Sequence, residues 1–138
     1  MGREEKEVAF RVAMRIYWED TDAAGIVFYA NYLKFFERAR SEWLRSLGFG
    51  QESLRKDAGI AFVVSATALR YRRPARLDDV IDVSVAVVHL GQASLEIAQE
   101  ARRAGELLAD GTIRIGCVEL GTFRPCRIPN DIRLSIHR

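Results

Sequence analysis

Apolar and polar positions alternate over the first part of the chain, from residue 10 to residue 19. The apolar positions in this segment are Phe10, Val12, Met14, Ile16 and Trp18. A period of two is typical of a strand with one buried face. Residues 20–25 then read as a turn, in which Gly25 supplies backbone freedom or a close approach to a ligand.

Between residues 29 and 47 the apolar spacing changes to three or four, which predicts an amphipathic helix. Its apolar positions are Tyr32, Phe35, Phe36, Ala39, Trp43 and Leu47. Gly48 is a suitable C-terminal cap. The helix has two candidate starts, because Asn31 is a preferred N-cap residue and a start two residues earlier fits equally well.

The rest of the chain reads mainly as strands. After a polar segment at 51–58 that predicts a short helix, four strand candidates follow at residues 61–71, 80–90, 94–102 and 107–120. Asp110 and Gly111 inside the last candidate predict a bulge or bend. One strand, one long helix and four strands with short connections predict an α+β domain with a five-stranded antiparallel sheet.

Size and charge limit the possibilities. A chain of 138 residues predicts one domain over residues 1–138. The net charge of +2 is too small to indicate a nucleic-acid ligand, and no apolar run approaches the ~20 residues of a membrane span. Residues 1–8 lack the apolar core of a signal peptide, so we expect a cytoplasmic protein. One helix covers only one face of such a sheet, so we expect a homodimer at least.

Several kinds of site are not expected. The sequence contains no glycine-rich phosphate loop, and no nucleophile elbow precedes the helix. His89 and His137 are the only histidines and neither lies near a cysteine or carboxylate motif, so we expect no metal site. Cys117 and Cys126 are too few for a disulfide scaffold, and Cys117 reads as a buried thiol in a strand.

The remaining candidate is a catalytic carboxylic acid that works without a histidine. Asp22 lies after the first strand and shortly before the helix, whose start presents unpaired N–H groups and a partial positive charge. Such an acid can attack a carbonyl, or activate water against it, while those N–H groups hold the carbonyl oxygen. Alternatively, Asp22 is only a turn residue. Asp20 reads as a turn former, and Glu37 either reaches a cleft or is a solvated helix residue.

The segment from Asp20 to Tyr32 reads D-T-D-A-A-G-I-V-F-Y-A-N-Y. It resembles the 4-hydroxybenzoyl-CoA thioesterase branch of the hotdog-fold enzymes, and the similarity continues through Ala39-Arg40 and residues 74–79. The chain also resembles the Tol–Pal-associated thioesterases, which carry a histidine where this chain has Tyr29. The resemblance implies the hotdog fold, with the sheet wrapped around one long helix. It also implies hydrolysis of an aromatic or short-to-medium acyl-CoA to a free acid and coenzyme A.

The same resemblance assigns roles. It implies that Asp22 is the nucleophile or the general base, and that the backbone N–H of Tyr29 polarises the carbonyl. Active sites of this family lie between subunits, which implies a homodimer or homotetramer. No cofactor is implied, because coenzyme A is part of the substrate. The residues expected to contact the substrate are Gly25, Val27, Tyr32, Phe62, Val63 and Val64.

Coenzyme A phosphates need basic partners. The basic cluster of the aromatic-acyl enzymes has no counterpart in residues 90–94. The candidates in this chain are Arg70, Arg72, Arg73 and Arg76. Surface or interface ion pairs are the alternative role for each of them.

A hydratase and a non-catalytic binding module are the two alternatives to a hydrolase. Hydratases of this fold use an acid and a histidine at a short fixed spacing, but the fifth residue after Asp22 is Val27. A non-catalytic acyl-CoA sensor or assembly module would use the same inter-subunit pocket. Such proteins usually add a nucleic-acid-binding segment, and none precedes Phe10. The hydrolase is therefore preferred, with the binding module as the alternative.

Overall fold

The structure is a computed structural model that describes residues 7–136. Residues 1–6 and His137 lie outside the described residues, so most of the segment predicted to lack a signal-peptide core is not described. The elements in chain order are β1 (Phe10–Arg15), the 3-10 turn η1 (Trp18–Asp20), α1 (Asn31–Ser46), α2 (Gln51–Ser53), the π-turn η2 (Leu54–Ala58), β2 (Ile60–Tyr71), β3 (Val80–Leu90), β4 (Ser94–Arg103), β5 (Glu106–Glu119) and α3 (Asn130–Ile136).

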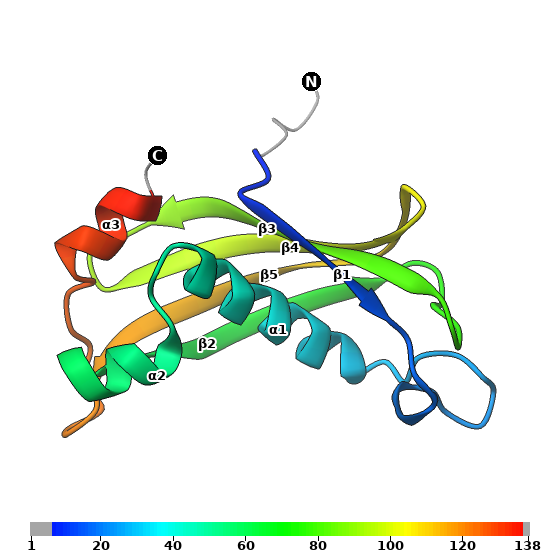
Figure 1. Cartoon of the computed structure of the whole chain (residues 1–138), viewed down its shortest axis with the longest axis horizontal. Helices are drawn as coiled ribbons and strands as arrows, with labels where there is room; N and C mark the ends of the chain where they lie inside the picture. The colour runs from blue at the N-terminus through cyan, green and yellow to red at the C-terminus, as the bar shows by residue number, and fades with distance from the viewer. Residues whose placement is uncertain (1–6, 137–138) are drawn as a thin grey trace.

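The strands form one antiparallel sheet in the order β1-β3-β4-β5-β2. Helix α1 crosses one face of this sheet, and α2 and α3 lie at the same end of the molecule, apart from each other (Figure 1). The loop between β1 and α1 lies at the opposite end. This arrangement confirms the predicted α+β fold with a five-stranded antiparallel sheet.

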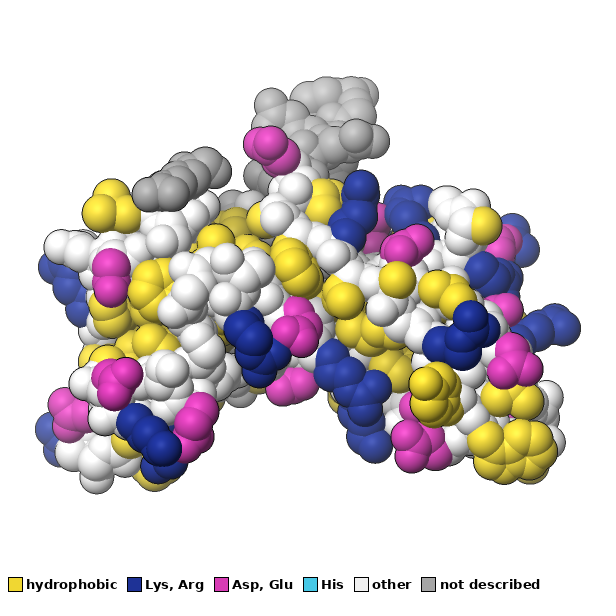
Figure 2. Space-filling view, in the orientation of Figure 1, with side chains coloured by type: hydrophobic (Ala, Val, Ile, Leu, Met, Phe, Trp, Pro, Cys, Tyr) yellow, Lys and Arg dark blue, Asp and Glu magenta, His cyan; other side chains and the backbone are white. Residues whose placement is uncertain are grey.

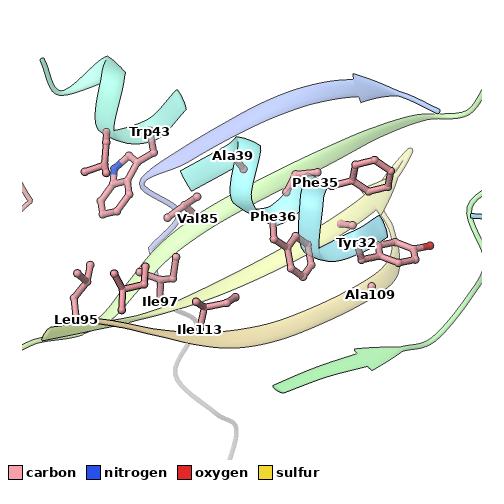
Figure 3. Close-up of a cluster of buried hydrophobic side chains, with 14 of the residues drawn as sticks. Tyr32, Phe35, Phe36, Ala39, Trp43, Val85, Leu95, Ile97, Ala109 and Ile113 are labelled. Atoms are coloured by element: carbon pink, nitrogen blue, oxygen red, sulfur yellow. The ribbon is translucent and has the colours of Figure 1, made fainter. Parts of the chain in front are cut away.

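The core lies between α1 and the sheet. Figure 3 shows the α1 side chains Tyr32, Phe35, Phe36, Ala39 and Trp43 packed over Val85, Leu95, Ile97, Ala109 and Ile113 of the strands. Phe35 and Phe36 are almost completely buried. Burying a side chain of this size stabilises a fold by about 1.5–3 kcal/mol. The apolar stripe predicted from the sequence is therefore what fixes α1 to the sheet.

A polar anchor adds to this core. Gln99 of β4 is fully buried, and its Nε2 donates to the backbone oxygens of Phe36 (3.1 Å) and Ser84 (3.2 Å). Its Oε1 accepts a hydrogen bond from Nη1 of Arg40 at 3.0 Å. Because every polar atom of this amide has a partner, Gln99 fixes the position of α1 along the sheet without leaving a buried group unsatisfied.

Both predicted boundaries near the start of the chain are wrong in detail. The chain leaves the sheet after Arg15, because Oδ2 of Asp20 accepts the N–H of Tyr17 at 2.8 Å and closes a 3-10 turn. The N-cap of α1 is Ala30, and Asn31 is its first helical residue. The Asn31 side chain instead donates to the backbone oxygen of Asp20 at 2.8 Å, which ties the loop to the helix. The turn-forming role predicted for Asp20 is confirmed.

Of the bulge or bend predicted at Asp110 and Gly111, the bulge is wrong. Pairing between β2 and β5 runs without a shift through both residues, and its one irregularity lies between Val64 and Ala66. Gly111 has a different purpose, because a Cβ there would lie 2.3 Å from Cδ2 of Leu69. The glycine therefore permits a close approach of the two strands.

Two features of the ends complete the fold. Gly48 follows the C-cap of α1 with a φ of +94°, as expected for a glycine that ends a helix. Helix α3 was not predicted, although Pro129 followed by Ile132 and Ile136 at a spacing of four is a usable helix signal. Of the helices within residues 7–136, none is long and apolar enough to cross a membrane.

Candidate active site at the start of helix α1

Asp22 lies in a tight hairpin turn. The N–H of Asp22 donates to the oxygen of Ile26 at 2.9 Å, and the N–H of Gly25 donates to the oxygen of Asp22 at 3.0 Å. Gly25 has a φ of +79°, which favours glycine. Aspartate at the first and glycine at the fourth position are typical of a type I turn in a short hairpin. The sequence D-A-A-G therefore positions the carboxylate through local backbone geometry.

Only one oxygen of the Asp22 carboxylate accepts a hydrogen bond within this turn. Its Oδ1 accepts the N–H of Ala24 at 2.8 Å, and the side chain is exposed. Among residues 7–136, Oδ2 accepts no hydrogen bond. One oxygen therefore stabilises the turn, as the turn interpretation expects, and the other has no partner among the described residues.

The amide of Tyr29 is available as well. The amides of Phe28 and Asn31 are occupied, since Phe28 donates to the oxygen of Asp20 (3.0 Å) and Asn31 donates to the oxygen of Phe28 (2.8 Å), whereas the N–H of Ala30 has no acceptor among residues 7–136. The N–H of Tyr29 has no acceptor in the described part of the chain. It lies directly before the N-cap Ala30, at the positive end of α1.

Aromatic side chains lie beside the ring of Tyr29. A concavity of about 290 Å³ is lined by Ile26, Val27, Tyr29, Tyr32, Tyr71, Arg72, Arg73 and Pro74. The ring of Tyr71 lies 5.9 Å from that of Tyr29 and 5.5 Å from that of Tyr32. Burial raises the pKa of the Tyr32 hydroxyl, which accepts the N–H of Ala75 at 3.2 Å. Sequence analysis missed Tyr71, although an aromatic residue ending a strand that leads to Pro74 was a visible signal.

A second concavity, of about 380 Å³, contains Asp22 itself. It is lined by Trp18, Thr21, Asp22, Ala23, Gly25 and Leu77. The sequence pattern placed Trp18 among the buried positions of a strand, but its side chain is 79% exposed because β1 ends before it. Figure 2 shows hydrophobic side chains gathered on the surface at this end of the molecule, over the loop before α1.

An apolar cavity of about 190 Å³ lies beneath the other half of α1. Its lining residues are Glu37, Arg40, Trp43, Leu44, Gln51, Phe62, Val64, Leu95, Ile115 and Ile136. Val63 does not line it, because successive side chains of a strand point to opposite faces. Glu37 lines this cavity but is exposed, and its carboxylate accepts the hydroxyl of Ser41 at 3.1 Å one turn along the helix, as expected for a solvated helix residue. Burial lowers the pKa of the Arg40 guanidinium at the same wall.

The predicted substrate residues therefore fall into separate places in one chain. Gly25 lies with Asp22, Val27 and Tyr32 lie with Tyr29, and Phe62 and Val64 line the far cavity. Arg40 of that cavity is nine residues along the helix from Asn31, a rise of about 14 Å. One chain does not bring the acid, the free amide and the apolar cavity together.

The four arginines considered for coenzyme A phosphates are not equivalent. Arg72 makes a bidentate pair with Asp110, at 2.7 and 3.3 Å, and Arg73 pairs with Glu106 at 3.1 Å. Arg70 and Arg76 are exposed and form no ion pair with any residue between 7 and 136. These two guanidinium groups are thus the ones left available to an anionic ligand.

Cysteine, histidine and carboxylate side chains do not gather into a metal site. Within residues 7–136 no group of three or more of them is placed to hold an ion. Cys117 is buried in β5, as predicted, and both cysteines are free thiols.

Comparisons with known proteins show the family of the chain. The family model of the thioesterase-like superfamily matches residues 16–136. The chain is 39% identical over 128 residues to an acyl-CoA thioesterase YbgC of Haemophilus influenzae, covering 93% of this chain and 94% of that protein. A probable thioesterase of Bartonella henselae superposes with a TM-score of 0.83 at 31% identity, over 86% of this chain and 98% of that one. A gentisyl-coenzyme A thioesterase superposes with a TM-score of 0.83 at 28% identity, over 91% and 98%.

The fold is that of the hotdog thioesterases, and relatives named as acyl-CoA thioesterases or thioester hydrolases at 37–39% identity identify the chain as a thioester hydrolase. The chain belongs to the thioesterase-like superfamily.

Proposed function

We propose that the protein hydrolyses acyl-CoA thioesters to a free acid and coenzyme A. The observation that carries this proposal is the pairing, on one short loop, of a carboxylate oxygen of Asp22 without a partner and an N–H of Tyr29 without an acceptor. The first supplies a nucleophile or base, and the second supplies a donor for the carbonyl oxygen. A single donor of this kind typically contributes about 10²–10³ in rate.

Two routes fit these groups. In the first, Oδ2 of Asp22 attacks the thioester carbon, the bond to sulfur breaks, and coenzyme A leaves as a thiolate that takes up a proton. Water then hydrolyses the resulting anhydride and regenerates the carboxylate. In the second, Asp22 takes a proton from water as that water attacks the carbon directly, the bond to sulfur then breaks, and coenzyme A leaves as a thiolate that takes up the proton. Either route needs only protein groups and water, so we propose that no cofactor takes part.

We propose that the working unit is a homodimer formed along β2. This strand is the edge of the sheet, and its 12 residues are largely exposed, including Val63, Val64 and Tyr71. A long, exposed, apolar edge strand is a template for pairing with another chain. A two-fold axis across antiparallel β2 strands would place the apolar cavity of one chain against the start of α1 in the other. Such pairing joins the parts that one chain keeps apart, and pairing of dimers would give the expected homotetramer.

The cavity supports an acyl group of limited size. At about 190 Å³ it exceeds the roughly 150 Å³ of an apolar cavity known to hold benzene. An aromatic ring or a short-to-medium chain fits this space, and one similar structure is that of a gentisyl-coenzyme A thioesterase. We place the coenzyme A phosphates near Arg70 and Arg76, whereas Arg72 and Arg73 would first have to leave their carboxylate partners. We propose a cytoplasmic location for this reaction.

Release of free thiol from aromatic, short-chain and long-chain acyl-CoAs tests the proposal. The wild-type chain, Asp22→Asn and the control Asp57→Asn are compared, because Asp57 is exposed on η2 and far along the chain from the site. We expect turnover by wild type and by the control, and a loss of at least about 100-fold in Asp22→Asn. Tight acyl-CoA binding without turnover would instead support the binding module. Full activity of Asp22→Asn would show that another residue is the catalytic acid.

A further inference from the structure

The chain contains only two cysteines, and they touch each other. Sγ of Cys117 lies 3.5 Å from Sγ of Cys126, within hydrogen-bonding distance for two thiols, and neither is in a disulfide. Neither residue lines the concavities at the start of α1 or the apolar cavity. The proposed hydrolysis leaves this pair of thiols without a role.

The backbone holds the pair in a geometry close to that of a disulfide. Val118 of β5 forms an antiparallel bridge with Pro125, so Cys117 and Cys126 lie directly opposite each other. The N–H of Cys126 donates to the oxygen of Cys117 at 2.9 Å. Residues directly opposite each other on antiparallel segments have Cα atoms about 4.5–5.5 Å apart. Disulfides usually span Cα separations of about 4.4–6.8 Å, so a bond between these residues requires little backbone movement.

The two thiols differ in access. Cys117 is completely buried on the core side of β5, opposite Phe62 of β2. Burial raises the pKa of its thiol to about 12, with a further contribution from Cys126. Cys126 is only partly buried, on the segment that connects β5 to α3. An oxidant arriving from solvent therefore meets Cys126 first. The raised pKa keeps Cys117 protonated and unreactive toward the oxidant, so Cys117 reacts second, with the sulfenic acid beside it, and gives up its proton as water leaves.

We propose that Cys126 and Cys117 form a reversible oxidation site, in which Cys126 reacts with a hydroperoxide and Cys117 resolves the product to an intramolecular disulfide. In the first step an S–O bond forms at Cys126, the O–O bond of the peroxide breaks, and water or an alcohol leaves. In the second step Sγ of Cys117 attacks Sγ of Cys126, the S–O bond breaks, and water leaves with the proton of Cys117. The two thiols are oxidised and the peroxide is reduced.

This bond would fix the C-terminal segment to the sheet. The N–H of Ile128 donates to the oxygen of Gln92 at 2.8 Å, and the Arg133 side chain donates to the oxygen of Gly91. The segment ends in α3, where Ile136 lines the apolar cavity beneath α1. The disulfide would add a covalent tie to the hydrogen bonds that already hold this wall of the cavity.

The experiment treats the purified full-length chain with hydrogen peroxide, blocks free thiols, and measures the intact mass and the cysteine peptides. We expect wild type to lose two hydrogens within one chain, with no covalent dimer on a non-reducing gel, and to recover with dithiothreitol. In Cys117→Ser, dimedone should trap a sulfenic acid at Cys126. In Cys126→Ser, Cys117 should stay unmodified over the same time.

Cys117→Ala serves as a second variant, and circular dichroism checks that each variant is folded. Three results would overturn the inference. In the first, the blocking reagent still labels both thiols of wild type after peroxide, so neither has been oxidised. In the second, a disulfide forms only between chains, and in the third, Cys117 is oxidised as fast in Cys126→Ser as Cys126 is in Cys117→Ser. None of these measurements depends on acyl-CoA turnover, so the proposal stands or falls separately from the proposed function.

Discussion

The N–H of Ala24 donates to Oδ1 of Asp22 at 2.8 Å, so the turn that positions this carboxylate also occupies one of its two oxygens. An asparagine can keep that hydrogen bond through its own Oδ1, whereas an alanine cannot. The structural role and the chemical role of Asp22 are therefore separable by substitution.

Asp22→Asn and Asp22→Ala should differ in stability but agree in activity. We expect both to lose at least about 100-fold in turnover, because neither side chain can act as nucleophile or base. Only Asp22→Ala should also lower Tm, since it removes the acceptor for Ala24. Thiol release and thermal unfolding measure the two effects. Equal Tm losses in both variants would show that the turn does not depend on this hydrogen bond.

Gly111 should not tolerate a side chain. A Cβ there would lie 2.3 Å from Cδ2 of Leu69 and 2.6 Å from the oxygen of Ala68. We expect Gly111→Ala to reduce the free energy of unfolding by about 1–3 kcal/mol, because the two strands must separate to admit it. Gly116→Ala in the same strand is the matched control, because nothing lies within 4 Å of its Cβ. Denaturant unfolding measures the free energy of unfolding of both variants. An equal loss in the two variants would refute the close-approach explanation.

Because Asp79 forms an ion pair with Arg103, the free energy of unfolding should depend on pH in the acidic range. Burial acts to raise the pKa of the Asp79 carboxyl, but hydrogen bonds from Arg103 (2.7 Å) and the N–H of Arg76 (2.8 Å) outweigh it and hold that pKa below its ordinary value of 3.8. A lowered folded-state pKa means that the stabilisation is fully present above 3.8 and is lost as the pH falls through the folded-state value.

We therefore expect Asp79→Asn to reduce the free energy of unfolding by about 0.5–1 kcal/mol at neutral pH, after screening by solvent. The difference between wild type and Asp79→Asn should shrink as the pH falls below about 4. Urea unfolding across this pH range is the measurement, and Asp57→Asn is the control. A difference that stays constant down to the lowest pH would contradict the assignment to this ion pair.

The edge strand β2 should control both assembly and activity. Ala66 and Ala68 are exposed on this strand, and glutamates at both positions would place like charges on two facing edges. Like charges directly opposite each other destabilise strand pairing. We expect Ala66→Glu/Ala68→Glu to shift the protein toward monomer in light scattering and to lose turnover with it.

Ala9→Glu/Ser53→Glu adds the same charge at exposed positions outside β2 and should leave assembly unchanged. An active monomer of the β2 variant would show that one chain carries a complete site. It would also remove the reason for placing the partner's apolar cavity at the start of α1.

The sequence alone determined the elements that depend on local order. Alternation with a period of two and the apolar stripe of α1 predicted the sheet and its helix, because burial must follow the geometry of each element. The turn that carries Asp22 was also local, since aspartate and glycine at fixed positions of a turn need no distant partner.

Only the tertiary structure decided what depends on residues distant in the chain. Strand β1 ends before Trp18 because Asp20 closes a turn there, and Arg72 is paired because Asp110 lies on the neighbouring strand. Val64 lines a cavity and Val63 does not, because adjacent side chains of a strand point to opposite faces and the pairing of β2 with β5 sets which face each one takes. Cys117 and Cys126 touch because a strand and a later loop meet at one bridge. Such contacts are set by how the elements pack and pair, and local sequence patterns do not encode them.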